Sequence, residues 1–245
     1  MTKSVREPLA RLKPRAARIV AALKRKYPRA TTALHYSTAH ELLVATVLAA
    51  QCTDKKVNEV TETLFKKYRS PQDFAAASQA TLEQEIRPAG FFRNKAKSVI
   101  ALSRAIVEKH GGKVPGNLEH LVELPGVGRK TANVVLAAVF GKPGIIVDTH
   151  MIRLATRLGF TRHKDPVKIE FELMEIIAKR DWGAFSFTIT LHGRGVCKAQ
   201  RPLCHICVVE SYCPSSLLRN KTASAHRPGG RKPSRRAKAA PLPHS

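Results

Sequence analysis

Four cysteines near the C-terminal end constrain the folding of this chain more than any other feature of its sequence. They form the pattern C-x6-C-x2-C-x5-C at Cys197, Cys204, Cys207 and Cys213. The N-terminal residues contain no apolar signal-peptide segment, so we expect free thiols and no disulfides. Four thiolates with one C-x2-C pair fit a tetrahedral zinc ion or an iron–sulfur cluster, and the spacing alone leaves both open. The loops are short, so metal binding should be part of folding.

The charge balance narrows the class of partner. Lys and Arg total 43 against 18 Asp and Glu, which gives a formal net charge of +25 at pH 7. A field of this sign attracts polyanions, and nucleic acid is the usual one, although a ribosomal or membrane-surface protein would share the charge. No apolar run is long enough to span a bilayer. We expect a monomer in the cytoplasm, associated with the nucleoid and not with a membrane.

Apolar residues recur at helical spacing along most of the chain, which predicts an all-α fold. A basic helix is expected over 8–27, and further helices are expected over 40–51, 54–68, 79–87, 93–110, 117–124, 129–140, 148–159, 165–180 and 182–193. Residues 145–147 are apolar but too few to indicate a strand. From position 219 the chain has eight Lys or Arg and no acid. We expect 218–245 to form a disordered basic tail that tethers DNA electrostatically.

The segment 124–132, LPGVGRKTA, has the composition of a turn between two helices. Pro125 ends the first helix, and Gly126 and Gly128 are expected to adopt the positive φ of a tight turn. A glycine turn that enters a helix exposes backbone N–H groups, and the helix dipole adds positive potential, so a DNA phosphate can bind closely. Arg129 begins the second helix and is expected to contact DNA as well. An ordinary turn would explain PGVG alone, but the net charge favours phosphate binding.

Lys130 lies in the first turn of that second helix. The helix dipole favours anions at this end, so it destabilises an ammonium, and partial burial would do so further. A neutral amine is a nucleophile that can form a Schiff base with a sugar C1′. A surface lysine that binds phosphate is the alternative, and position alone does not exclude it.

Eighteen residues after Lys130, Asp148 follows an apolar run and precedes a helix in the segment GIIVDTH. Its simplest role is that of a helix N-cap. An acid exposed at such an end could instead face Lys130, accept its proton and stabilise a cationic sugar. His150 could contact phosphate or pack inside the protein.

Together, LPGVGRKTA, then VDTH and then the four cysteines resemble the endonuclease III family of helix–hairpin–helix DNA glycosylases with AP-lyase activity. The resemblance covers roughly residues 8–217 and implies two helical domains with a DNA groove between them. A six-helix barrel with the hairpin would span 32–142. Residues 1–31 and 143–217 would form the other domain, with a [4Fe–4S] cluster on the four cysteines, which makes zinc the lesser alternative.

The resemblance also implies a reaction in base excision repair. Lys130 would attack C1′ of a damaged nucleotide, Asp148 would be the family's aspartate, and the Schiff base would allow β-elimination of the 3′ phosphate. The partner would be double-stranded DNA with abasic sites or with oxidised or ring-saturated pyrimidines such as thymine glycol.

Chemistry on an extruded nucleotide requires side chains that fill the hole in the duplex. The resemblance gives this role to Gln51 and makes Phe91 a second wedge, at a position where relatives carry leucine. A phenyl ring can stack where an isobutyl group only wedges, which puts the opposite-base preference in doubt. Asp54 matches an acid that lines the family's pocket.

Three other functions compete with this interpretation. An adenine-mismatch glycosylase of the same superfamily has no lysine at the position of Lys130 and has a further C-terminal domain. A pyrimidine-dimer glycosylase/lyase keeps the lysine, so the sequence does not exclude dimers as substrates. A non-enzymatic, redox-sensing DNA-binding protein would use the cluster as its switch but would not need Lys130 and Asp148.

Overall fold

The computed structural model describes residues 7–219 and has the predicted all-α fold, with no β-strand in that range. The longer helices are α1 (Leu9–Lys26), α2 (Ala39–Leu48), α3 (Asp54–Lys67), α6 (Phe92–His110), α8 (Arg129–Ala138), α9 (Thr149–Arg157), α10 (Pro166–Ile176) and α11 (Trp182–Gly195). The shorter elements are α4 (Pro71–Ala75), α5 (Gln79–Glu85), α7 (Leu118–Val122) and the 3₁₀ helices η1 (Arg87–Ala89), η2 (Lys179–Asp181), η3 (Cys204–Ile206) and η4 (Glu210–Tyr212).

Side-chain caps explain where several helices begin. In each case a side-chain oxygen just before the helix accepts a hydrogen bond from a backbone N–H of the first turn. The residues that do so are Thr38, Thr53, Asn117, Asp148 and Asp165. Hydrophobic spacing does not predict α4, which begins with a capping box between Ser70 and Asp73. The helix predicted over 165–180 ends at Ile176, and η2 follows it.

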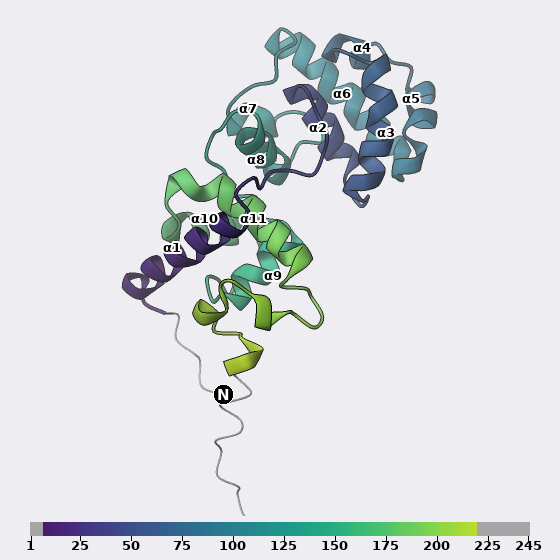
Figure 1. The fold of residues 1–245 in the computed structure, drawn as a ribbon. Coiled ribbons are helices and arrows are strands. Elements are labelled where there is room, and N and C mark those ends of the chain that lie inside the picture. The colour runs from purple at the N-terminus through teal and green to yellow at the C-terminus, as the bar shows by residue number, and fades with distance from the viewer. Residues whose placement is uncertain (1–6, 220–245) are drawn as a thin grey trace, which may run out of the picture.

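Two clusters of buried apolar side chains divide the described residues into two lobes (Figure 1). The first lobe contains α2 to α8, and its core runs from Leu34 to Leu136 with Ile146 added. The second lobe contains α1 and α9 to α11, and its core includes buried residues of α1 together with Ile145 and later residues as far as Val209. The second lobe is therefore built from the N-terminal helix and the C-terminal part of the chain. The predicted domain limits stay a prediction, although the two cores are compatible with them.

Polar contacts join the two lobes. Arg129 of α8 binds Glu170 of α10 through two hydrogen bonds, and the Ile146 backbone N–H donates to Ser186 Oγ at 2.9 Å. The helix that carries Lys130 also packs against α11. The segment before Asp148 and the helix that carries Lys130 are thus both fixed to α11 of the second lobe.

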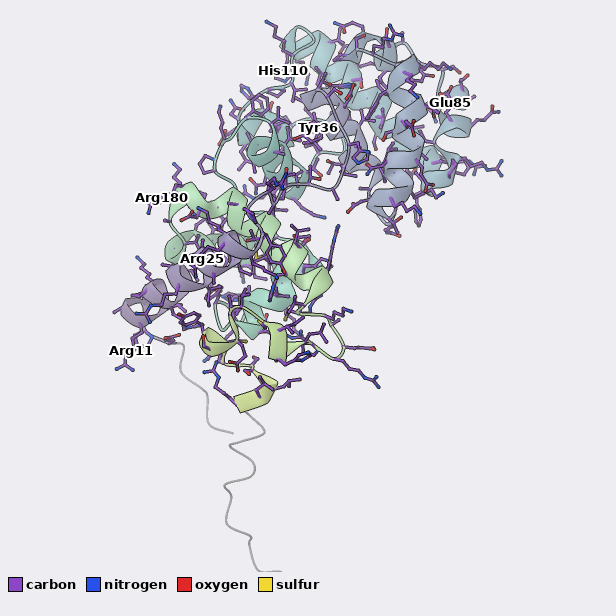
Figure 2. All side chains as sticks on the ribbon, viewed as in Figure 1. Arg11, Arg25, Tyr36, Glu85, His110 and Arg180 are labelled. Carbon is purple, nitrogen blue, oxygen red and sulfur yellow. The ribbon has the colours of Figure 1, made fainter. Side chains whose placement is uncertain are left out.

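Basic side chains are numerous on the second lobe. Figure 2 shows Arg11, Arg25 and Arg180 on the side that carries α1, and all three are exposed. Most of the predicted tail lies outside the described residues, but Arg219 within it donates to the carbonyl oxygens of Glu210 and Cys213. No helix within 7–219 is both long enough and apolar enough to cross a membrane.

Candidate active site and nucleic-acid interface

The two glycines of the hairpin have different conformations. Gly126 has a φ of +77°, and a Cβ there would lie 3.1 Å from Ser98 Cβ, so the turn requires a glycine at this position. Gly128 has a φ of −88° in an extended conformation, and the expectation of a positive φ there is wrong. A Cβ built on Gly128 would meet no atom within 4 Å. Its backbone at the start of α8 is therefore open on the side where a Cβ would project, which leaves room for a phosphate.

Arg129 and Lys130 are adjacent in the sequence but differ in their surroundings. Arg129 Nη2 and Nε bind the two carboxylate oxygens of the buried Glu170 at 2.7 and 3.0 Å, and this hydrogen bonding raises the pKa of Arg129. Arg129 is thus engaged with Glu170, although part of its side chain stays exposed, and its DNA contact stays a prediction. Lys130 is exposed, and it forms no hydrogen bond or ion pair with the residues of the described range. The Lys130 amine is therefore accessible to a ligand.

Asp148 is the N-cap of α9, as its simplest interpretation predicts. Its Oδ1 accepts the Met151 backbone N–H at 2.7 Å, and its Oδ2 lies 3.2 Å from the Thr190 hydroxyl, which shares its one proton with the Ser186 carbonyl oxygen at 3.1 Å. These two bonds orient the carboxylate, and Oδ2 keeps the capacity to accept a further proton or hydrogen bond. The cap and the proposed acid are therefore compatible roles of one side chain.

His150 is half-buried and lies in the electrostatic field of both Asp148 and Lys130. Burial lowers its pKa, the charge of Asp148 opposes that shift, and the charges of Arg153, Arg194 and Lys130 add to it. Arg153 Nη2 lies 3.1 Å from His150 Nδ1. Because arginine can only donate, Nδ1 accepts and the proton of the neutral ring is on Nε2. The packing prediction and the phosphate prediction for His150 can both hold, one for each ring nitrogen.

Gln51 and Phe91 lie beside the same hollow, although forty residues separate them in the chain. The hollow has a volume of about 300 Å³, and Gly126 of the hairpin also lines it. Both backbones are left-handed, with φ of +54° at Gln51 and +47° at Phe91. The Phe91 side chain is 63% exposed. Packing explains neither the exposed ring nor the strained backbone of Phe91.

Asp54 and Arg194 form an ion pair of 2.7 Å between the first turn of α3 and the end of α11. The pair joins the two lobes, and both residues line a hollow of about 850 Å³ beside α3. Asp54, which the resemblance matches to a pocket acid, is thus paired with an arginine from the cysteine-containing lobe. Nothing in the local sequence around Arg194 indicates this contact, because its partner lies 140 residues earlier in the chain.

The four cysteines converge beside the second core. Cys197, Cys207 and Cys213 pack against that core. Burial raises the pKa of the Cys207 thiol to about 11, and the other three cysteines raise it further. Thiols that resist ionisation so strongly become metal ligands only where a metal compensates the charge of the thiolates.

A basic donor and a histidine ring accompany these thiols. Arg157 Nη1 donates to Cys197 Sγ at 3.3 Å, and His192 Nε2 lies 3.4 Å from Cys207 Sγ. Donors to sulfur suit an iron–sulfur cluster, whose thiolates accept hydrogen bonds. Within the described residues, no three His, Cys, Asp or Glu side chains are arranged to hold a single metal ion. The donor set fits the predicted cluster.

Two family models match separate parts of the chain. Residues 44–179 match the HhH-GPD superfamily base excision DNA repair protein. Residues 197–213, from the first to the last cysteine of the motif, match the iron–sulfur binding domain of endonuclease III.

Similar whole proteins have the same description. Endonuclease III of Synechocystis sp. is 49% identical over 85% of this chain and 95% of its own length. Endonuclease III of Bacillus subtilis is 47% identical over 80% and 90%. A solved structure described as a trapped endonuclease III–DNA covalent intermediate in an estranged-adenine complex matches with a TM-score of 0.79 and 42% identity. That match covers 85% of this chain and 98% of the solved chain.

Proposed function

The chain belongs to the endonuclease III family of helix–hairpin–helix base excision repair proteins, and we propose that Lys130 and Asp148 carry its chemistry. The enzyme is a DNA glycosylase and AP lyase with a [4Fe–4S] cofactor. The observation that carries the assignment is the contrast at the hairpin. Arg129 is engaged with Glu170, whereas Lys130 is exposed beside the open backbone of Gly128.

The reaction begins with attack of the neutral Lys130 Nζ on C1′ of the damaged nucleotide. The Nζ–C1′ bond forms as the glycosidic bond breaks, and the base leaves with the electron pair of that bond. Opening of the sugar ring, with a proton moving from Nζ to O4′, gives a protonated Schiff base. Removal of a C2′ proton then expels the 3′ phosphate by β-elimination, which cleaves the strand.

Asp148 has two functions in this scheme. Its Oδ2 accepts the proton that the Lys130 ammonium must lose before attack, while Thr190 and the Met151 N–H hold the carboxylate in place. Its negative charge then stabilises the cationic sugar. Because the carboxylate caps α9, a shift of that helix would displace the acid from the amine.

The hairpin, His150 and the two wedges bind the DNA in this proposal. The N–H groups at Gly128 and the Nε2–H of His150 hold phosphates on the damaged strand. Gln51 fills the hole left by the extruded nucleotide, and the exposed ring of Phe91 stacks in the opposite strand. These contacts are to phosphates and to the base stack, so they do not identify the damaged base. We propose that the pocket selects oxidised or ring-saturated pyrimidines and that abasic sites are also cut. The enzyme would act as a monomer on nucleoid DNA.

Borohydride trapping tests the nucleophile. We expect a covalent complex between the enzyme and an abasic-site duplex, and none with Lys130→Gln, because borohydride reduces only a Schiff base. Lys109→Gln, an exposed lysine at the end of α6, is the matched control and should trap as the parent does. Asp148→Asn keeps an acceptor for the α9 cap and should slow trapping about a hundredfold with little change in affinity. Trapping that persists in Lys130→Gln would refute the assignment.

A substrate panel tests the specificity. Duplexes with thymine glycol, a pyrimidine dimer, adenine opposite 8-oxoguanine or an abasic site are incubated with the enzyme, and strand cleavage is measured. We expect cleavage at thymine glycol and at the abasic site. Preferred cleavage of the dimer would assign the enzyme to the dimer glycosylases, and loss of adenine without lyase activity would point to a mismatch glycosylase.

A further inference from the structure

Lys95 is a buried lysine that joins the two loops carrying Gln51 and Phe91. It is the fourth residue of α6, and the residue is 5% exposed. Its Nζ donates to the carbonyl oxygens of Leu48 and Ala89, both at 2.8 Å. Leu48 is the last residue of α2, three before Gln51, and Ala89 is the last residue of η1, two before Phe91. One ammonium therefore links the ends of both loops.

The two carbonyl groups depend on this lysine. Within residues 7–219, neither the Leu48 nor the Ala89 oxygen receives another hydrogen bond. Carbonyls at helix ends lack partners within the helix, and buried ones destabilise the protein unless another group satisfies them. An ammonium has three donors and can satisfy acceptors from two segments at once. Burial lowers the pKa of Lys95, so the protein tolerates an unfavourable environment for this charge.

The backbones of both wedges need support from their surroundings. Gln51 and Phe91 have positive φ, which is strained for residues with a Cβ and persists only when neighbouring structure enforces it. Both residues are exposed, so packing of their own side chains contributes little to that enforcement. The bonds from Lys95 lie just before each strained residue and restrain both loops.

We propose that Lys95 is a positioning residue that fixes the separation of Gln51 and Phe91, so that both enter the duplex together. The inference rests on the proposed function and concerns how the hole in the duplex is filled. Without the tie, either wedge could relax to an ordinary backbone conformation. Extrusion of the nucleotide would then be less favourable, while the amine of Lys130 would remain in place.

A comparison of two substrates tests this role. An abasic site in single-stranded DNA has a reactive C1′ but no opposite strand, so there is no hole to fill. The ratio of borohydride trapping rates, duplex to single strand, is measured for the parent, Lys95→Met and Lys95→Arg. We expect the ratio to fall about tenfold in Lys95→Met, the scale of a lost hydrogen bond to a charged donor. Lys95→Arg, which can also donate to two carbonyls, should give an intermediate ratio.

Ser103→Ala is the matched control. Ser103 is buried in the same helix and joins α6 to His40 of α2 by a hydrogen bond of 2.9 Å, away from the wedge loops. It should keep the parent ratio even where its stability falls. An equal loss on both substrates in Lys95→Met would overturn the positioning role and leave a structural one. If Lys95→Met does not fold, Lys95→Arg decides the question, and an equal loss of trapping on both substrates in that variant would also overturn the positioning role.

A double-mutant cycle adds a readout that general destabilisation would not move. In a background of Gln51→Ala with Phe91→Ala, Lys95→Met should leave the ratio within about twofold, because the wedges it positions are absent. A full tenfold loss in that background would contradict the proposal. If the parent enzyme traps neither the duplex nor the single strand, the Lys130 assignment is refuted. Failure of the Lys130 assignment can therefore be told apart from failure of the Lys95 proposal.

Discussion

The two lobes differ in how they are held together. The first lobe closes on an apolar core, and the buried polar groups His40, Ser103 and Lys95 find partners within the lobe. The core of the second lobe ends at the cysteines, where the chain forms only the short 3₁₀ helices η3 and η4. The hairpin and the wedge residues Gln51 and Phe91 belong to the first lobe, which is stabilised by its own apolar core. Lys130 thus lies in a lobe that closes on its own core, Asp148 caps α9 of the second lobe, and the cysteine loops depend on a bound group.

Loss of the cluster should have the largest effect, and it should disturb the cysteine loops while the helices of the first lobe remain folded. Cys207→Ser removes the thiol that lies 3.4 Å from His192 Nε2, and loops without regular structure should then lose their conformation. We expect the affinity for an abasic-site duplex to fall at least about a hundredfold, because structural metal sites contribute folding free energy. Limited proteolysis should cut between 197 and 213 first, while circular dichroism shows that most helices remain. If DNA affinity and resistance to protease are unchanged, the cysteine loops do not depend on a bound group and the two lobes do not differ in this way.

The contact between the lobes should give the next largest effect. Glu170 is buried, and it binds Arg129 and the Asn133 side-chain amide, which also donates to the Ile145 carbonyl oxygen at 2.9 Å. Glu170→Gln removes the charge but keeps the size, so we expect the free energy of unfolding to fall by about 3 kcal/mol. Glu175→Gln, at an exposed position of the same helix, is the control. Urea unfolding measures both, and an equal change in the two variants would contradict the role of Glu170.

Sequence reasoning recovers the features whose causes are local. The cap at Asp165, the turn at Gly126 and the cysteine motif follow from short segments. The partners of Lys95 and Glu170 do not, because periodicity indicates which face of a helix is buried but not what it meets. Both residues nevertheless fall on buried faces of α6 and α10. A charged residue on an apolar helix face indicates that a buried partner is present, although the sequence does not identify it. The capping box of α4 is a second signal that hydrophobic spacing does not include.

A buried histidine should make the first lobe sensitive to acid. Ser103 Oγ donates to the Val99 carbonyl oxygen and so accepts from His40 Nε2, and burial lowers the pKa of His40 to about 4. Below the ordinary pKa of 6.5, the unfolded chain binds a proton that the folded chain does not. Stability therefore falls as the pH falls from about 6.5 to about 4.

The expected loss from this histidine is about 2 kcal/mol between pH 7 and pH 5. The measurement is urea unfolding at both pH values for the parent and for His40→Gln. The variant should be less stable at pH 7 but should lack this part of the pH dependence. Equal slopes for the two proteins would show that His40 is already charged in the folded state or that its contribution is negligible.

Alanine substitutions of the two hairpin glycines should have the smallest effects, and the two substitutions should affect different properties. Gly126→Ala places a Cβ on a left-handed backbone and 3.1 Å from Ser98 Cβ, so stability should fall by about 1 kcal/mol. Gly128→Ala introduces a Cβ that meets no protein atom within 4 Å on an extended backbone, and it should leave stability unchanged or slightly raised. Its methyl group projects where the phosphate would bind, so DNA affinity should fall several-fold. DNA affinity is measured by fluorescence anisotropy. If Gly128→Ala binds DNA as tightly as the parent, no phosphate binds at this helix end and the hairpin is a purely structural turn.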